Sequence, residues 1–232
     1  MWVLGIETST YAGSVALIED ERVVGEVFIN LGPSHSEKLL PIIEWLLREV
    51  GLNKEDVEGI AVSVGPGSFT SVRVGVATAK GLAFSLGVPV VGVSSLEVLA
   101  LNFPFAPFVI CSIIDARKGE VFMALFRSLN GSLERISEDT LVRPEQLISI
   151  IREKTVFVGD GTLSYRELLK DSLGELALFS TPSLNFPRAS NCALIGIERL
   201  KKGQKDDVFS LAPKYLRKSD AEILKEKRGE IQ

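Results

Sequence analysis

Three short stretches of the chain combine residue types that bind phosphate groups or metal ions. Each follows an apolar, β-type run, so each should lie where a strand ends and backbone amides are free. A carboxylate there can organise a metal ion or a water molecule. Each stretch is also an ordinary strand-end sequence, so a complete nucleotide site in this chain is one of two interpretations. The candidate nucleotide-binding residues in these stretches are Glu7, Thr8, Ser9, Asp115, Gly159 and Gly161.

The sequence contains one histidine, His35, and this limits its catalytic chemistry. A metal site of two histidines four residues apart on a helix needs a second imidazole, and Leu39 stands in that place. Ser-His-Asp or Cys-His catalysis would have to use His35 as its base. We therefore predict no catalytic residue and no metal ligand, with His35 hydrogen-bonded locally at the start of a helix.

Residues 60–87 are the most informative stretch, and they predict a strand, a glycine turn and a helix. Within residues 71–86 only Arg73 and Lys80 are charged, and their spacing puts them on one narrow stripe. A helix that is apolar or small in nearly every other direction needs cover on two sides. One cover is the chain's own sheet, and the other is either a second layer of this chain or another protein.

This stretch resembles the TsaB (YeaZ-like) family, and the resemblance extends over most of the chain. Where the family usually has glycine, this chain has Ser71, whose side chain could change how closely the helix approaches its neighbour. The residues that carry the resemblance are Gly65-Pro66-Gly67-Ser68-Phe69-Thr70, Arg73-Val74-Gly75, Ala79-Lys80-Gly81-Leu82-Ala83, Glu7-Thr8-Ser9-Thr10, His35-Ser36, Gly92-Val93-Ser94-Ser95-Leu96, Asp115-Ala116-Arg117 and Pro213-Lys214-Tyr215-Leu216-Arg217.

The resemblance implies a non-catalytic scaffold and activating subunit of a tRNA threonylcarbamoyltransferase complex. Such a subunit pairs with a catalytic TsaD-type subunit, which carries the two-histidine site, to form N6-threonylcarbamoyladenosine (t6A) at position 37 of tRNAs. It also implies a TsaE-type ATPase that docks on the pair, and contact with tRNA through the complex. ATP and magnesium then belong to the complex, and no cofactor is assigned to this chain alone.

By the same resemblance, the first two helices form the pairing surface, and without a partner this surface would form a homodimer. Trp45 is its natural anchor, although Trp45 could instead cover a loop of its own chain. The residues assigned to the pairing surface are Pro41, Trp45, Ser71, Val72, Gly75, Ala79 and Leu82.

Two other functions remain open at this stage. The first is an actin-like, ATP-dependent small-molecule phosphotransferase, with Glu7 organising a metal ion and Asp115 acting as the base. The second is a peptidase, which the single histidine disfavours.

Composition sets further limits on the function. With 46% hydrophobic and 24% charged residues, the chain has the composition of a well-packed soluble protein. No apolar run in the sequence has the length of a membrane span. We therefore expect a cytosolic protein without membrane contact. The net charge of −4 argues against a chain that binds nucleic acid unaided. The basic cluster in residues 199–218 is then either a solvated face or a minor RNA-facing patch. Cys111 and Cys192 lie in apolar segments and are expected to be buried free thiols.

The predicted elements run β-β-β-α-β-α-β twice, with a proline-rich joint at residues 104–107. The fold class is α/β, a two-lobed actin-like (ASKHA, ribonuclease-H-like) fold in which each lobe is a mixed sheet. We divide the chain into an N-terminal lobe, residues 1–103, which carries the partner-binding helices, and a C-terminal lobe, residues 104–232, with a charged tail. In the second half we expect strands at 108–115, 120–127 and 133–142, and a last helix at 190–202.

Overall fold

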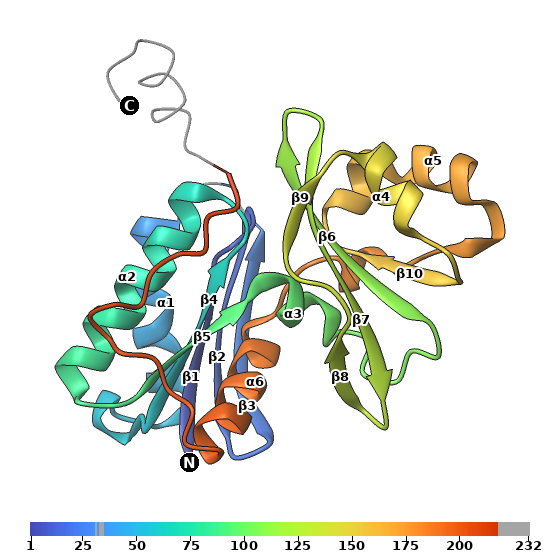
Figure 1. The fold of residues 1–232 in the computed structure, drawn as a ribbon. Helices are drawn as coiled ribbons and strands as arrows, with labels where there is room; N and C mark the ends of the chain where they lie inside the picture. Colours follow the sequence, from blue (N-terminus) through green and yellow to red (C-terminus); the bar gives the residue numbers. More distant parts are fainter. Residues whose placement is uncertain (31, 33–34, 218–232) are drawn as a thin grey trace, which may run out of the picture.

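The computed structural model describes residues 1–30, 32 and 35–217, which form two mixed β-sheets with helices on both faces of each (Figure 1). The charged tail that the sequence analysis places in the second lobe, residues 218–232, lies outside the described residues. The backbone of His35 opens the first helix, but its side chain is not described, so its local hydrogen bond stays a prediction.

The first sheet has five strands in the order β3-β2-β1-β4-β5. The first three form the predicted antiparallel meander, and β4 and β5 continue the sheet in parallel with β1. On β1 and β4, which lie between two helix layers, the β-branched residues Val3, Ile6, Ile60 and Val62 are fully buried. The strands are β1 (Trp2–Glu7), β2 (Ala12–Glu19), β3 (Arg22–Asn30), β4 (Gly59–Gly65) and β5 (Val90–Ser94).

The second sheet has the order β11-β10-β6-β7-β8, and β9 also pairs with β7. The single strand predicted at residues 133–142 was wrong, because this segment forms two short strands that both pair with β7. Between these two strands the regular backbone pairing with β7 is interrupted. There the Leu125 amide donates to the Ser137 hydroxyl, at 2.9 Å, instead of to a backbone carbonyl. The strands are β6 (Val109–Arg117), β7 (Glu120–Leu129), β8 (Ser132–Arg135), β9 (Thr140–Val142), β10 (Thr155–Val158) and β11 (Ala177–Phe179).

Six α-helices and three short 3₁₀ helices of the described chain surround these sheets. None of the helices in the described part of the chain has the length and hydrophobicity that a membrane span needs. The α-helices are α1 (His35–Val50), α2 (Phe69–Leu86), α3 (Ser95–Ala100), α4 (Pro144–Ile150), α5 (Gly161–Leu173) and α6 (Ala189–Lys201), and the 3₁₀ helices are Lys54–Asp56, Gly174–Leu176 and Pro182–Leu184.

The helices and sheets alternate in five layers, with α3 and α6 between the two sheets (Figure 1). On the outer face of the first sheet, α1 and α2 pack against residues such as Leu4 and Ile6. On the outer face of the second sheet, α4 and α5 cover residues such as Phe157. In the central layer, α6 packs on the first sheet and α3 packs on the second, so this layer belongs to both lobes.

The last helix, α6, therefore lies against the first sheet although it comes from the second half of the chain. It contacts β1, β2, β4 and β5, with Cys192 and Ala193 fully buried at this contact. A boundary after residue 103 thus separates the strands of the two sheets but not their helices. The predicted burial of both thiols is confirmed, and that burial raises the pKa of Cys111 and of Cys192.

The close approach of α6 to β1 requires glycine at position 5. A Cβ atom added there would lie 2.2 Å from the Ala189 carbonyl oxygen and 2.9 Å from the Ala193 Cβ. Because both atoms belong to the backbone or to a short side chain, neither can move aside without shifting the helix. Small residues at this contact therefore set the spacing between the first sheet and the central layer.

We predict that Gly5→Ala lowers the free energy of unfolding by about 3 kcal/mol, because it overpacks this contact. The control is Gly81→Ala on α2, where an added Cβ meets no heavy atom within 4 Å. That change should stabilise the chain by about 0.5–1 kcal/mol, since alanine is the better helix former. Urea unfolding of both variants is the measurement, and equal effects at the two positions would contradict the packing of α6.

Candidate functional site

A cleft of about 490 Å³ lies between the two lobes, at the carboxyl ends of their central strands. Its first-lobe wall is the turn after β1 and the start of α2, and its second-lobe wall is the end of β6 with Phe122 and Asp160. Residues 214–217, from the end of the described chain, also line it. The lining segments from the two lobes are 9–11, 67–70 and 114–117.

Glu7 and Thr8 lie behind the first-lobe wall rather than on it. Glu7 is fully buried, and one of its carboxylate oxygens accepts the Ser9 amide at 2.5 Å. This burial raises the pKa of Glu7. The Thr8 hydroxyl donates to the Ser71 carbonyl at 2.8 Å, and the Ser9 carbonyl accepts the Ser68 amide at 2.7 Å. In the first turn, the Ser9 amide is therefore already bound to the Glu7 carboxylate. Two hydrogen bonds, from Thr8 to Ser71 and from Ser68 to Ser9, hold this turn against the start of α2.

Asp115 and Asp160 stand together on the second-lobe wall. One Asp160 oxygen accepts the Asp115 amide at 3.0 Å. The Asp115 carboxylate accepts the Arg117 amide at 2.8 Å and the Ser164 hydroxyl at 3.1 Å. Burial, with the nearby Asp115 charge as a smaller cause, raises the pKa of Asp160 to about 6.

The two glycines that flank Asp160 face the second sheet. A Cβ at either position would contact the Ile113 carbonyl oxygen, at 1.9 Å from Gly159 and 3.2 Å from Gly161. The Gly159 amide donates to the Asn185 side chain at 3.1 Å. Of the six nucleotide-binding candidates, Ser9 and Asp115 line the cleft, whereas Glu7, Thr8, Gly159 and Gly161 do not, and their role in binding stays a prediction.

Several lining residues were missed by the sequence analysis. Asp160 lies between the candidate residues Gly159 and Gly161, and a carboxylate just after an apolar strand is the signal that could have identified it. Lys214 and Arg217 were treated as part of a basic cluster, but Lys214 bonds Asp139 at 3.0 Å and Arg217 approaches Glu120 at 3.5 Å. Arg199 in the same cluster pairs with Glu97 at 2.8 Å. These three cations pair with or approach carboxylates of their own chain, and the choice between a solvated face and an RNA-facing patch stays open.

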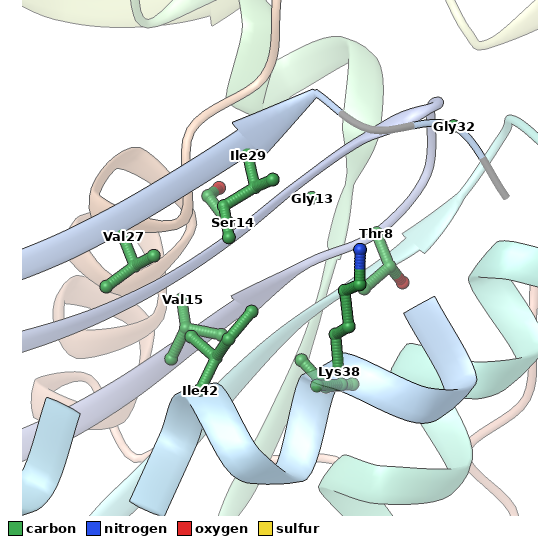
Figure 2. Close-up of a pocket in the computed structure, with 10 residues that line it drawn as sticks. Thr8, Gly13, Ser14, Val15, Val27, Ile29, Gly32, Lys38 and Ile42 are labelled. Atoms are coloured by element: carbon green, nitrogen blue, oxygen red, sulfur yellow. The ribbon is translucent and has the colours of Figure 1, made fainter. Parts of the chain in front are cut away.

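Two of the seven predicted pairing residues, Pro41 and Trp45, are exposed on the first helix. They line a shallow groove of about 490 Å³ between α1 and β3, together with Val27, Ile29, Ile42 and the charged Glu37 and Lys38. A small cavity of about 30 Å³ lies beside it, between α1 and the first sheet (Figure 2). Figure 2 shows Ile42 against Val15 and the Lys38 ammonium extending toward Thr8. This groove is apolar along its length and charged at one rim.

The remaining five pairing candidates lie on α2 and face inward to different degrees. Ser71, Val72, Gly75 and Ala79 are buried, and Leu82 is partly buried against the same core. A Cβ at Gly75 would lie 2.3 Å from the Thr8 hydroxyl oxygen, so the small residues here allow close approach to the chain's own first lobe. Their role in pairing stays a prediction.

Comparison with known proteins identifies the family. The family model for tRNA N6-adenosine threonylcarbamoyltransferase (TsaD) matches residues 29–225. The tRNA threonylcarbamoyladenosine biosynthesis protein TsaB of Bacillus subtilis is 36% identical over 225 residues, which cover 96% of each chain. This chain belongs to the TsaB family.

Solved structures agree with that assignment and with the fold class. YeaZ from Pseudomonas aeruginosa superposes with a TM-score of 0.80 at 27% identity, covering 93% of this TsaB-family chain and 99% of that one. The ROK hexokinase of Thermus thermophilus superposes with a TM-score of 0.50 at 15% identity, covering 88% of this chain and 100% of the hexokinase, which shows a shared fold alone. The predicted two-lobed actin-like α/β fold is confirmed.

The raised pKa of Asp160 predicts a pH-dependent stability. The folded state binds the Asp160 proton more tightly than the unfolded chain does. The stability that this proton contributes is fully present below about pH 3.8 and is lost as the pH rises through about 6. Asp160→Asn should therefore gain stability over the wild type between pH 4 and 7, by about 3 kcal/mol in total. Urea unfolding across this range measures the difference, with Asp171→Asn on the exposed face of α5 as the control. A difference that does not change with pH would contradict the burial of this charge.

Proposed function

We propose that this chain is a non-catalytic scaffold and activating subunit for t6A formation at position 37 of tRNAs, and that it pairs with a TsaD-type catalytic subunit. Membership of the TsaB family supports the pathway, since the Bacillus subtilis relative is named for threonylcarbamoyladenosine biosynthesis. The sequence has a single histidine, so a site of two histidines four residues apart must be supplied by the partner.

The observation that carries this proposal is the apolar groove between α1 and β3. Trp45 is 46% exposed and Leu40 is 55% exposed on α1, next to Pro41, and nothing in the described chain covers them further. A large aromatic side chain half-exposed beside an apolar groove is well placed to become the buried centre of an interface. The degree of exposure of Trp45 also weighs against the alternative that it covers a loop of its own chain.

The other partners follow from the pairing. A TsaE-type ATPase and the tRNA would meet this chain in the assembled complex, where ATP and magnesium would also bind. Without its catalytic partner, the chain would use the same α1 surface to form a homodimer, because an exposed self-complementary patch favours a two-fold arrangement.

Trp45→Ala should weaken the affinity for the TsaD-type subunit by about 30-fold, which corresponds to about 2 kcal/mol, because it removes the anchor of the groove. Isothermal titration of the two purified subunits measures this change. The matched control is Leu163→Ala on α5, which removes a 65% exposed apolar side chain from the other lobe and should leave the affinity unchanged. If Trp45→Ala leaves the affinity unchanged, the assigned pairing surface is wrong. If it causes a large loss of folding stability, Trp45 belongs to the core.

The isolated chain should bind ATP and magnesium no more tightly than about 1 mM. The Ser9 amide is already bonded to Glu7 and the Gly159 amide to Asn185, so two of the backbone amides that could hold a phosphate group are occupied. Calorimetry with the nucleotide and the metal tests this. Saturable micromolar binding that Asp115→Asn abolishes would instead support the phosphotransferase.

A further inference from the structure

The last described residues of the chain, 205–217, return along α2 (Figure 1), and residues 214–217 line the cleft. This segment starts at the edge of the first sheet. The Asp206 amide donates to the Val90 carbonyl at 2.9 Å, and the Asp206 carboxylate accepts the Gly92 amide at 2.7 Å. This end of the segment is thus held like an added strand on β5.

Along α2, the two charged residues of the helix hold the segment. The Lys80 ammonium donates to the carbonyls of Phe209 and Leu211, at 3.0 and 2.9 Å. The Phe209 ring packs edge-on against Phe84, with centroids 5.7 Å apart. The second cover that this helix needs is therefore supplied in part by the chain itself, along the stripe that carries Lys80.

Nearer the cleft, Arg73 continues this contact. Its guanidinium lies 3.8 Å from the centre of the Phe69 ring and donates to the Tyr215 hydroxyl at 2.6 Å. The rings of Phe69 and Tyr215 lie 4.6 Å apart. The Lys214 amide donates to the Val64 carbonyl at 2.7 Å, which anchors the segment to the end of β4.

At its far end the segment crosses to the second lobe, where its polar contacts are of another kind. The Lys214 ammonium bonds the fully buried Asp139 carboxylate at 3.0 Å, and Arg217 donates to the Ala116 carbonyl at 2.9 Å and approaches Glu120 at 3.5 Å. Asp139 is also held by Arg135, at 2.6 Å, so it keeps a partner without Lys214. Leu216 adds an apolar contact with the core of the second lobe.

The two attachments therefore differ in kind. The first lobe holds two backbone amides of the segment and contacts it with Lys80 and Arg73, while the hydrogen bonds to the second lobe in the described segment come from two long cationic side chains of the segment itself. The Lys214 side chain is 42% exposed, so its ion pair is partly screened by water and salt. Residues 214–217 are at the same time part of the cleft lining.

We propose that residues 205–217 form a lid over the cleft between the lobes, which opens by releasing residues 214–217 while residues 205–211 stay attached to β5 and α2. Opening requires the ion pairs of Lys214 and Arg217 to break and Leu216 to leave its apolar contact. The Lys214 amide must also leave the Val64 carbonyl, and the Tyr215 hydroxyl must leave Arg73. Asp139 and Glu120 remain on the second lobe, where Lys214 and Arg217 can pair with them again when the lid closes. The lid does not depend on the pairing function proposed above.

The test compares Lys214→Met/Arg217→Met with the wild type by hydrogen exchange of the full chain. The Lys214 amide should exchange about 10-fold faster in this variant, while the Asp206 amide keeps its protection. The control, Lys201→Met/Lys202→Met on α6, removes two cations from exposed ion pairs elsewhere and should change neither amide. Unchanged protection at Lys214, or the same loss in the control, would overturn the proposal.

Two further measurements keep the proposal falsifiable if the double variant loses stability throughout. In the wild type, raising the salt concentration should speed exchange at Lys214 before it does so at Asp206, because salt screens the second-lobe ion pairs. A cysteine introduced by Ser68→Cys, on the cleft wall, should react with a maleimide about 10-fold faster when the lid cations are removed. Salt-independent exchange, or an equal labelling rate, would show that the segment is not a lid.

Discussion

The packing of α6 onto the first sheet is the contact on which the arrangement of the two lobes depends. Because α6 lies in one layer with α3, and α3 packs on the second sheet, the spacing of this layer sets the distance between the sheets. That spacing is kept small by Gly5, whose missing side chain lets the Ala189 backbone approach β1. The cleft and its walls are a consequence of this spacing. The strand β1, which Ser9 follows, and the strand β6, which carries Asp115, end on either side of the central layer.

The order of elements could be predicted from the sequence because it follows from local patterns. β-branched runs, glycine stops and amphipathic spacing are visible within ten or twenty residues. The position of α6 could not be predicted in this way, because its apolar face fits either sheet. The same holds for residues 205–217, whose backbone follows no periodicity and is held by Arg73 and Lys80, more than a hundred residues earlier in the chain.

Small and apolar side chains in a sequence predict close packing, but they do not identify the surface that packs against them. On α2, Gly75 and Ala79 pack against the chain's own first lobe, and their role on a pairing surface stays a prediction. On α1, Trp45 lies on the polar side of the helix by sequence and is exposed in the structure. At the cleft, Asp115 could be predicted because it ends an apolar strand, whereas the proximity of Asp160 and Lys214 depends on how the chain folds back.

The central proposal is that this chain acts as a binding partner through the apolar groove on α1, and its mass in solution tests this most directly. Light scattering should be measured on the chain alone and after mixing with the two-histidine TsaD-type relative from the same genome. The account predicts that a one-to-one complex forms and replaces any homodimer. A chain whose mass is unchanged by the relative would contradict it, and would direct attention to the cleft between the lobes.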